Sequence, residues 1–345
     1  MTATAASTIH AVLIADSPAQ RRELVRVLQQ DGDIAVVAES GSGEDPVGLV
    51  IRTLPHVVVL GVTGDGAQHL IEQVMARVPT PILVLQPRAG RQSAAAVDAL
   101  VAGALEVMPV PEQWTVPLGT KLRHSVRQIR KVTVIRHPRG SRTRTPRPLP
   151  EPGIAEQPVV ALAASTGGPS ALATVLAGLH GLRAPVLVVQ HLHPDFTAGL
   201  IEWMSRASAL PVKAATHGEP ARPGHVYLAP GELHLRLGGG GRLELVPTPI
   251  TVHRPSADQL FESVAARAGR AGVGVLLTGM GEDGARGLLE MHRAGARTFG
   301  QDEASCAVYG MPRAALRLGA VAKSDMVGLE QVAASVCRVV SAAVR

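Results

Sequence analysis

Short apolar runs alternate with amphipathic segments along the first third of the chain. A helical segment over residues 18–30 places Leu24, Val27 and Leu28 on one face. The apolar runs are rich in Val, Ile and Leu, which is typical of buried strands. They occupy residues 10–16, 34–40, 56–62, 81–86 and 105–110. Five strand–helix units predict an open parallel sheet of the flavodoxin-like type, with right-handed crossovers.

The same alternation returns after residue 157, with longer connections. Residues 158–164, 185–190 and 273–279 are almost wholly apolar, which is typical of strands buried on both faces of a parallel sheet. Residues 224–230 and 233–247 alternate around a run of glycines, and we expect them to form a small antiparallel excursion. The second region is therefore predicted to be a doubly wound, mainly parallel α/β domain.

Positive charge is concentrated between the two regions. The chain has a net charge of +6, yet residues 121–147 contain ten Lys or Arg and no Asp or Glu, so the remainder is net acidic. Residues 131–157 are also rich in Pro and have no apolar periodicity, which predicts a solvated linker. We therefore expect domains at 1–130 and 158–345, and no specific binding of nucleic acid by the linker.

Composition narrows the class of protein further. No apolar run approaches the roughly 18 residues that span a bilayer, so we predict a cytoplasmic protein without membrane insertion. Aromatic residues make up only 2% of the chain, which argues against a stacking platform for nucleic acid. Cys306 and Cys337 lack the spacing of a metal site, and nothing completes a metal shell around His191 and His193. We predict no metal and no cofactor.

Three polar residues follow predicted buried strands of the second region. Ser165, His191 and Asp283 each stand at or just beyond a strand end. Since the carboxyl ends of parallel strands share one edge of a sheet, these side chains are expected to meet there. A serine hydroxyl needs a neighbouring base, and the base needs an acceptor that fixes its tautomer. The pattern favours a serine hydrolase.

The local sequence leaves other interpretations open. Ser165 precedes a predicted helix and is also a plausible helix N-cap, Asp283 could cap the helix that follows it, and His191 could be structural. The glycine spacing does not match a dinucleotide-binding fingerprint. An α/β-hydrolase elbow fits poorly, because Ala163 stands where that motif has glycine and the chain order is Ser, His, Asp.

Six segments stand out between about residues 160 and 325: "ASTGGPSAL", "VVQHLHPDFT", "RPGHVYLAP", "HRPSADQLFESVA", "VGVLLTGMGEDGARGL" and "QDEASCAVYGMPRAA". In this order they resemble the signature blocks of the chemotaxis protein-glutamate methylesterases. The resemblance implies that Ser165, His191 and Asp283 are catalytic. It also implies hydrolysis of glutamyl methyl esters on chemoreceptor helices and, in many members, deamidation of receptor glutamines.

The resemblance also suggests roles around the triad. Backbone groups of Thr166, Met280 and Gly281 are expected to bind the oxyanion, since glycine-rich turns and helix starts present free N–H groups. Gly167, His253 and Arg254 are expected to line a shallow substrate cleft, with Asp258 in its wall. The partner implied is a methylated chemoreceptor. A catalytically idle scaffold that binds receptors is the alternative function.

Residues 9–130 resemble the receiver domain that this family carries ahead of its esterase. Receivers bind Mg²⁺ and a phosphoryl group through acidic residues and a lysine at the strand ends. Here only Asp16 remains of the acidic pair, Gly61 stands at the phosphoacceptor position, and Val110 replaces the lysine. We predict a pseudo-receiver without phospho-Asp control, with Asp65 as the only substitute phosphoacceptor. The domain is expected to cover or expose the esterase constitutively, or to respond to a signalling partner.

Overall fold

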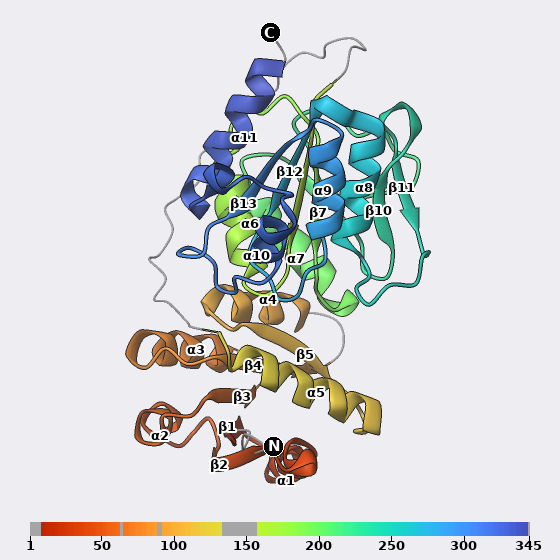
Figure 1. The fold of residues 1–345 in the computed structure, drawn as a ribbon. Helices are drawn as coiled ribbons and strands as arrows, with labels where there is room; N and C mark the ends of the chain where they lie inside the picture. The colour runs from red at the N-terminus through yellow and green to blue at the C-terminus, as the bar shows by residue number, and fades with distance from the viewer. Residues whose placement is uncertain (1–7, 63–64, 88–91, 133–156, 344–345) are drawn as a thin grey trace, which may run out of the picture. The chain divides into compact units, whose positions relative to one another are not determined.

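The structure is a computed structural model that describes residues 8–62, 65–87, 92–132 and 157–343. The chain divides into two compact units, Met1–Pro138 and Arg139–Arg345, and each is described by itself (Figure 1). Except for three residues, the predicted linker at 131–157 lies outside the described residues. Within the described ranges, no helix has the length and apolarity needed to cross a membrane.

The first unit is a parallel sheet of five strands in the order β2-β1-β3-β4-β5. This is the flavodoxin-like order expected from the sequence, so the predicted fold of this unit is confirmed. The strands are β1 (Ile9–Ala15), β2 (Ile34–Ser40), β3 (Val57–Gly61), β4 (Ile82–Pro87) and β5 (Glu106–Val110). The helices are α1 (Pro18–Leu28), α2 (Pro46–Thr53), α3 (Asp65–Arg77), α4 (Gln92–Ala102) and α5 (Val116–Ile129).

The amphipathic pattern at the start of the chain explains why α1 packs on this sheet. Leu24, Val27 and Leu28 are buried, as their spacing on one helical face predicts. Ser17 caps the helix by accepting a hydrogen bond from the Gln20 amide, and proline occupies the first turn. The helix therefore starts directly after β1 and holds its polar residues near the carboxyl end of that strand.

The second unit contains a parallel sheet of seven strands in the order β14-β13-β12-β6-β7-β9-β8. Its strands are β6 (Val159–Ala164), β7 (Val186–Gln190), β8 (Val212–Ala214), β9 (Val226–Leu228), β12 (Gly272–Leu276), β13 (Arg297–Gln301) and β14 (Met326–Val327). The chain extends the sheet from β6 through β7 first, and returns to the other side of β6 with β12. The topological switch, where α/β folds bind ligands, lies between β6 and β12.

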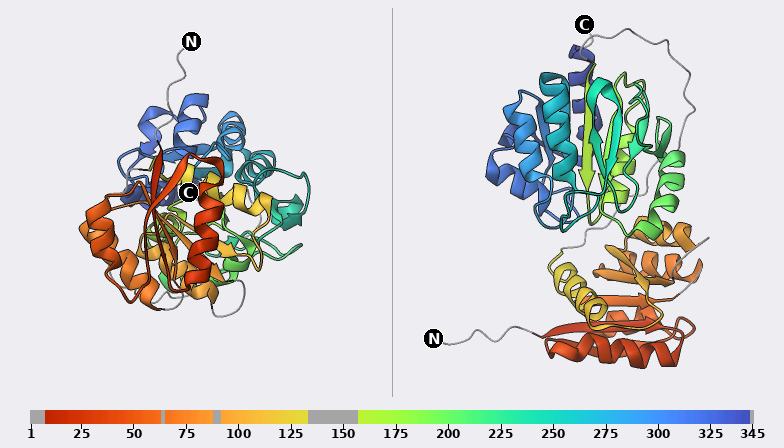
Figure 2. Two further views of the ribbon diagram at one scale, coloured as in Figure 1. Left: turned by 90° about the horizontal axis from the view of Figure 1, so that it is seen from below. Right: turned by 90° about the vertical axis from the view of Figure 1, so that its right-hand side faces the viewer.

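Helices cover both faces of this sheet (Figure 2). The right-hand view of Figure 2 shows α8 and α9, in cyan and blue, on one face and green α7 on the other. The helices are α6 (Gly168–Ala177), α7 (Pro194–Ala207), α8 (Ala257–Ala268), α9 (Ala285–Arg293), α10 (Met311–Leu318) and α11 (Leu329–Ala343). The arrangement confirms the predicted doubly wound α/β class.

One part of the predicted antiparallel excursion is wrong. The strands β10 (His234–Leu237) and β11 (Leu243–Val246) form the expected antiparallel pair around the glycine run. Residues 224–230, which alternation grouped with that pair, instead supply β9, which joins the main sheet in parallel between β7 and β8. All three residues of β9 are buried, and burial on both faces is what a strand inside a parallel sheet requires.

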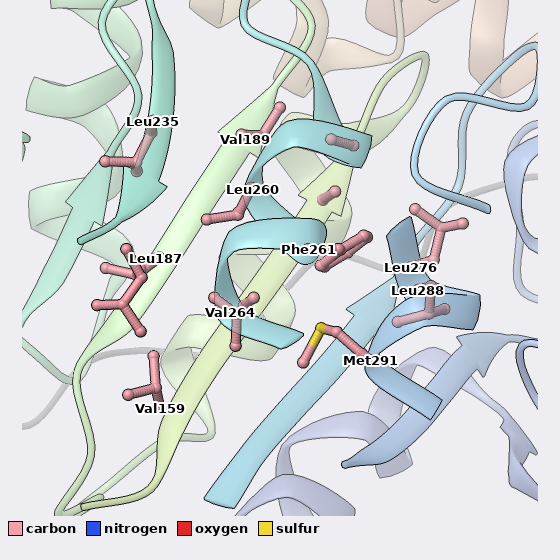
Figure 3. Close-up of a cluster of buried hydrophobic side chains, with 14 of the residues drawn as sticks. Val159, Leu187, Val189, Leu235, Leu260, Phe261, Val264, Leu276, Leu288 and Met291 are labelled. Atoms are coloured by element: carbon pink, nitrogen blue, oxygen red, sulfur yellow. The ribbon is translucent and has the colours of Figure 1, made fainter. Parts of the chain in front are cut away.

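One hydrophobic cluster of the second unit lies between the sheet and helices α8 and α9 (Figure 3). Leu187 and Val189 of β7 face Leu260, Phe261 and Val264 of α8, and all are buried. Each fully buried aliphatic or aromatic side chain of this size stabilises the fold by about 1.5–3 kcal/mol. This packing fixes the start of α8 against the ends of the central strands, where the candidate site is found.

Candidate active site

Ser165 and His191 stand opposite one another at the ends of two adjacent strands. Ala164 of β6 is in register with Gln190 of β7, so the next residue on each strand is Ser165 or His191. The His191 amide donates to the Ala164 carbonyl at 3.0 Å, which continues the ladder up to the site. Neighbouring strands lie about 4.8 Å apart, so the hydroxyl and imidazole are delivered to one edge, as expected.

The interpretation of Ser165 as a helix cap is wrong. The N-cap of α6 is Gly167, with a φ of 74°, and no side chain makes a capping hydrogen bond there. Gly167 is required for two reasons, because its backbone is left-handed and a Cβ would lie 2.5 Å from that of Ala307. The Ser165 hydroxyl makes no hydrogen bond within the described part of the chain and is free for chemistry.

Gln190 supports the site, a role that the sequence analysis did not assign to it. Its side chain is buried and donates to the carbonyls of Ser165, at 2.8 Å, and His191, at 3.0 Å. A Cβ on Gly168 would lie 2.0 Å from Oε1 of Gln190, so glycine is needed there to admit the amide. An amide at the last position of a buried strand was the available signal.

His191 and Asp283 form a hydrogen-bonded pair. Nε2 of His191 lies 2.8 Å from Oδ2 of Asp283, and both side chains are almost fully buried. A carboxylate only accepts hydrogen bonds, so it fixes the proton on Nε2 and leaves Nδ1 as the basic nitrogen. Nδ1 is buried and has no hydrogen-bond partner among the described residues, so it is free to accept a proton.

Asp283 is held by the start of α8 as well as by His191. It accepts hydrogen bonds from the Ser256 hydroxyl at 2.8 Å and from the amides of Ala257, at 2.7 Å, and Asp258, at 3.2 Å. Burial by itself raises the pKa of Asp283, but the hydrogen bond and charge of His191, with the Ala257 and Ser256 donors, hold it well below its ordinary value. The residue therefore stays ionised.

The suggested helix-capping role of Asp283 applies to a different helix from the one expected. Asp283 precedes α9 but accepts from the first amides of α8, whereas Asp258, in α8, accepts from Gly284 at 2.9 Å and Gly287 at 2.8 Å at the start of α9. A carboxylate at the start of each helix thus accepts hydrogen bonds from the free N–H groups at the start of the other helix. Asp258 also pairs with Arg286 and does not contact His191 in the described contacts.

His253 contacts the base of the pair directly. Its ring stacks on that of His191 with centroids 4.3 Å apart and planes inclined by 7°. Loss of hydration against this ring lowers the pKa of His253, repulsion from His191 adds to the effect, and Asp283 opposes it. Arg254 is exposed, and its guanidinium donates to the Pro247 carbonyl at 3.3 Å. His253 therefore lies at the site and Arg254 is its chain neighbour, and their expected role in a substrate cleft stays a prediction.

The backbone groups expected to bind an oxyanion are free to do so. The N–H groups of Thr166, Met280 and Gly281 make no hydrogen bond within the described residues. Thr278, which sequence reasoning missed, holds this region together through its side chain. Its hydroxyl donates to the Thr166 carbonyl at 3.0 Å and accepts from the Val308 amide at 2.9 Å. It therefore ties the turn after β6 to the chain that follows β12.

His193 lies beyond the strand end and has a local role. It is the N-cap of α7, and its Nδ1 accepts a hydrogen bond from the Asp195 amide at 3.4 Å. Within the ranges that the structure describes, no three His, Cys, Asp or Glu side chains gather as a metal site would require. His191 and His193 therefore serve different purposes, one toward Asp283 and one at a helix start.

Comparisons with known proteins identify the family. The family model described as CheB methylesterase matches residues 160–336. Protein-glutamate methylesterase/protein-glutamine glutaminase 4 of Myxococcus xanthus is 41% identical over 87% of this chain and 89% of its own length. Protein-glutamate methylesterase/protein-glutamine glutaminase of Pectobacterium atrosepticum is 37% identical over 97% of this chain and 98% of its own length.

The chain belongs to the CheB methylesterase family. A solved structure agrees, since the catalytic domain of the Thermotoga maritima CheB methylesterase is 31% identical, covers 54% of this chain and 98% of that one, and has a TM-score of 0.50. The resemblance inferred from the sequence motifs and the prediction of a carboxylic ester hydrolase are both confirmed. Membership favours an enzyme over the idle scaffold.

The receiver-like unit of this CheB-family chain has its own strand-end residues. Asp16 follows β1, Gly61 ends β3 beside Ala15, and Val110 ends β5 in register with Pro87 of β4. The structure thus brings the three degenerate positions to the carboxyl edge of one sheet. Asp65 begins α3, and its side chain lies outside the described residues.

The side chains at this edge are engaged with the protein itself. A Cβ on Gly61 would lie 3.2 Å from the amide nitrogen of Gln20, so a helix residue occupies the space in front of the glycine. Nη1 of Arg21 donates to the carbonyls of Ala15 and Asp16. Hydrogen bonds from Ser42 lower the pKa of Asp16, and the Arg21 charge acts in the same direction. An internal cation stands beside the one remaining acid.

Proposed function

We propose that this protein hydrolyses γ-methyl esters of glutamyl side chains on methylated chemoreceptors in the cytoplasm, releases methanol, and also deamidates receptor glutamines, as part of chemotactic adaptation. The observation that carries the proposal is the His191–Asp283 pair, whose unpartnered Nδ1 belongs to the residue that follows β7, as Ser165 follows the adjacent strand β6. The relatives are named for the same two activities, methylesterase and glutaminase.

In the proposed reaction Ser165 is the nucleophile and His191 the base. The Ser165 oxygen bonds to the ester carbonyl carbon as its proton passes to Nδ1 of His191. The tetrahedral intermediate then expels methanol, which takes the proton from His191. Water attacks the acyl-enzyme, gives a proton to His191, and releases the glutamyl carboxylate as the proton returns to Ser165. With glutamine the first leaving group is ammonia.

The surrounding groups support these steps. Asp283 stabilises the imidazolium that forms on His191 and keeps the ring in the required tautomer. The free N–H groups near Thr166 and Met280 are suited to bind the developing oxyanion, which in enzymes of this type contributes about 10²–10³-fold in rate. His253 lies over the His191 ring on one side, which limits access of water to the charged ring.

We further propose that the receiver-like unit acts without phosphorylation. Gly61 offers no carboxylate to phosphorylate, and Arg21 brings a positive charge where a receiver uses Mg²⁺. Mg²⁺ prefers several oxygen ligands, and Asp16 alone is a poor site. The unit is then a fixed element of the enzyme or a docking site for a signalling protein, rather than a switch operated by a phosphodonor.

Methanol release from a methylated chemoreceptor preparation tests the proposal. Without phosphodonor we expect release by the natural protein and a fall of about 10⁴–10⁶-fold in Ser165→Ala. Ser170→Ala, which removes a hydroxyl one turn into α6, is the matched control and is expected to retain activity. Acetyl phosphate is expected to leave the rate unchanged. Absence of release by the natural protein would contradict the proposed substrate, and activation by acetyl phosphate would contradict phosphorylation-free control.

A further inference from the structure

Two exposed aliphatic side chains stand on the segment that leads into the active site. Ile250 is 87% exposed and Val252 is 96% exposed, and both lie in the connection between β11 and α8. A single exposed aliphatic residue is ordinary on a protein surface. Two at nearly full exposure within three residues, directly before His253, present an apolar surface for which the described part of the chain supplies no cover.

This connection is held at both ends by one buried ring. His234 is fully buried, and its Nδ1 accepts a hydrogen bond from the Ser256 amide at 3.1 Å. Its Nε2 therefore carries the proton and donates to the Pro249 carbonyl at 2.8 Å. The intervening residues 250–255, the docking loop, are thus fixed at their base. A preorganised surface loses little entropy when it binds.

The docking loop is continuous with the catalytic groups. Val252 is the chain neighbour of His253, which stacks on His191. At the other end of the loop, Ser256 donates its hydroxyl to Asp283. A molecule seated on Ile250 and Val252 therefore lies close to the ring that stacks on His191. The loop is better placed to hold the substrate than to bind an unrelated partner.

We propose that Ile250 and Val252 dock the helix that carries the substrate side chain, by contacting apolar residues one turn away from it. This inference rests on the proposed function. Only two methylene groups separate the ester carbonyl of a methylated glutamate from the helix backbone, so the backbone must approach the cleft. Residues three and four positions away then lie about 5–6 Å from the reacting side chain and face the loop. The partner is a helix with aliphatic or small residues at these positions.

The test compares a protein substrate with a small one. Methanol release is measured for the full chain and for the double variant Ile250→Ser/Val252→Ser, with a methylated chemoreceptor preparation and with N-acetylglutamate γ-methyl ester. We expect kcat/KM for the receptor to fall about tenfold or more, mainly through KM, because two aliphatic contacts are lost. Hydrolysis of the small ester, which reaches only the catalytic groups, is expected to stay unchanged. Leu318→Ser, at a 48% exposed position ending α10, is the matched control.

Each other result overturns the inference. Equal receptor hydrolysis by the natural protein and the double variant removes the docking role. An equal fall for receptor and small ester shows that the loop acts on the chemistry, and a rise for both shows that it holds a cover over the site. If the natural protein fails to hydrolyse the receptor, the proposed function itself is overturned. This outcome is seen with the natural protein alone, so it is distinguished from the results above, which compare that protein with the double variant.

Discussion

Both units are open parallel sheets with polar residues at the carboxyl edge, and the two edges use these residues differently. In the esterase unit, Nδ1 of His191 and the hydroxyl of Ser165 lack hydrogen-bond partners in the described structure, although their surroundings are tightly bonded. In the receiver-like unit, Arg21 and Gln20 fill the space around Asp16 and Gly61. The edge of the esterase unit thus keeps unpaired groups on a rigid support, whereas the edge of the receiver-like unit pairs its polar groups internally.

The largest effect on activity is expected from a substitution of Asp283. Asp283→Asn should lower kcat for methanol release about 10⁴-fold, because the amide no longer fixes the tautomer of His191 or stabilises its charged form. The matched control is Asp258→Asn, which alters the carboxylate at the start of α9 and leaves the His191 contact in place. We expect it to lower the free energy of unfolding by about 1 kcal/mol and kcat by less than tenfold. Equal losses of kcat would mean that Asp283 acts only through helix packing.

The next effect concerns stability in the receiver-like unit. Arg21→Ala should lower its free energy of unfolding by about 1–3 kcal/mol, because two backbone carbonyls lose their donor. Arg22→Ala, at the exposed neighbouring position, is expected to change it by less than about 0.5 kcal/mol. Urea unfolding followed by Trp114 fluorescence in a Trp203→Phe background measures this unit alone. An unchanged free energy of unfolding in Arg21→Ala would show that the Arg21 guanidinium does not stabilise the carboxyl edge of this sheet.

A smaller effect is expected from the ring that stacks on the base. His253→Ala should lower kcat about three- to tenfold for both receptor and small ester, since an aromatic pair contributes about 0.5–1.5 kcal/mol. His253→Phe preserves the stack and should recover most of the rate. Loss of activity on the receptor alone would instead assign His253 to substrate docking, together with Ile250 and Val252.

Strand periodicity and position in the chain were enough to predict much of this molecule. Buried runs located the five strands of the first unit and the central strands of the second, and an amphipathic pattern located α1. The rule that parallel strands share a carboxyl edge correctly brought together Ser165, His191 and Asp283. Alternation failed at β9, because three buried residues carry too little pattern to distinguish a hairpin strand from a strand within the sheet.

Long-range contacts were beyond prediction for a physical reason. Three contacts each join residues from different elements. They are the stacking of His253 on His191, the hydrogen bonds between the Asp283 and Asp258 carboxylates and the amides at the starts of α8 and α9, and the packing of Gln20 in front of Gly61. No local propensity encodes such a contact, since it depends on how packed helices meet the sheet. The sequence could show which residues were chemically able to act, but the three-dimensional packing decides which of them are already paired.

The smallest expected effect is the pH dependence of stability that comes from Asp283 and Asp16, the acids at the strand ends of the two units. Asp283 and Asp16 both have a folded-state pKa below the ordinary value, so each carboxylate stabilises the fold above the unfolded-state pKa of about 3.9. That contribution is lost as pH falls from there through the folded-state pKa. The stability difference between the natural protein and Asp283→Asn should therefore be constant above about pH 5 and shrink below about pH 4.

Asp16→Asn should show the same sign with a smaller change, because Asp16 is exposed and Asp283 is almost fully buried. Urea unfolding over a pH series measures both, with Trp203 reporting on the esterase unit and Trp114 on the receiver-like unit. A difference that grows as pH falls would reverse the sign of the linkage and show that the carboxyl is stabilised in its protonated form. The contribution of Asp283 to stability is expected to depend on its charge far more than that of Asp16.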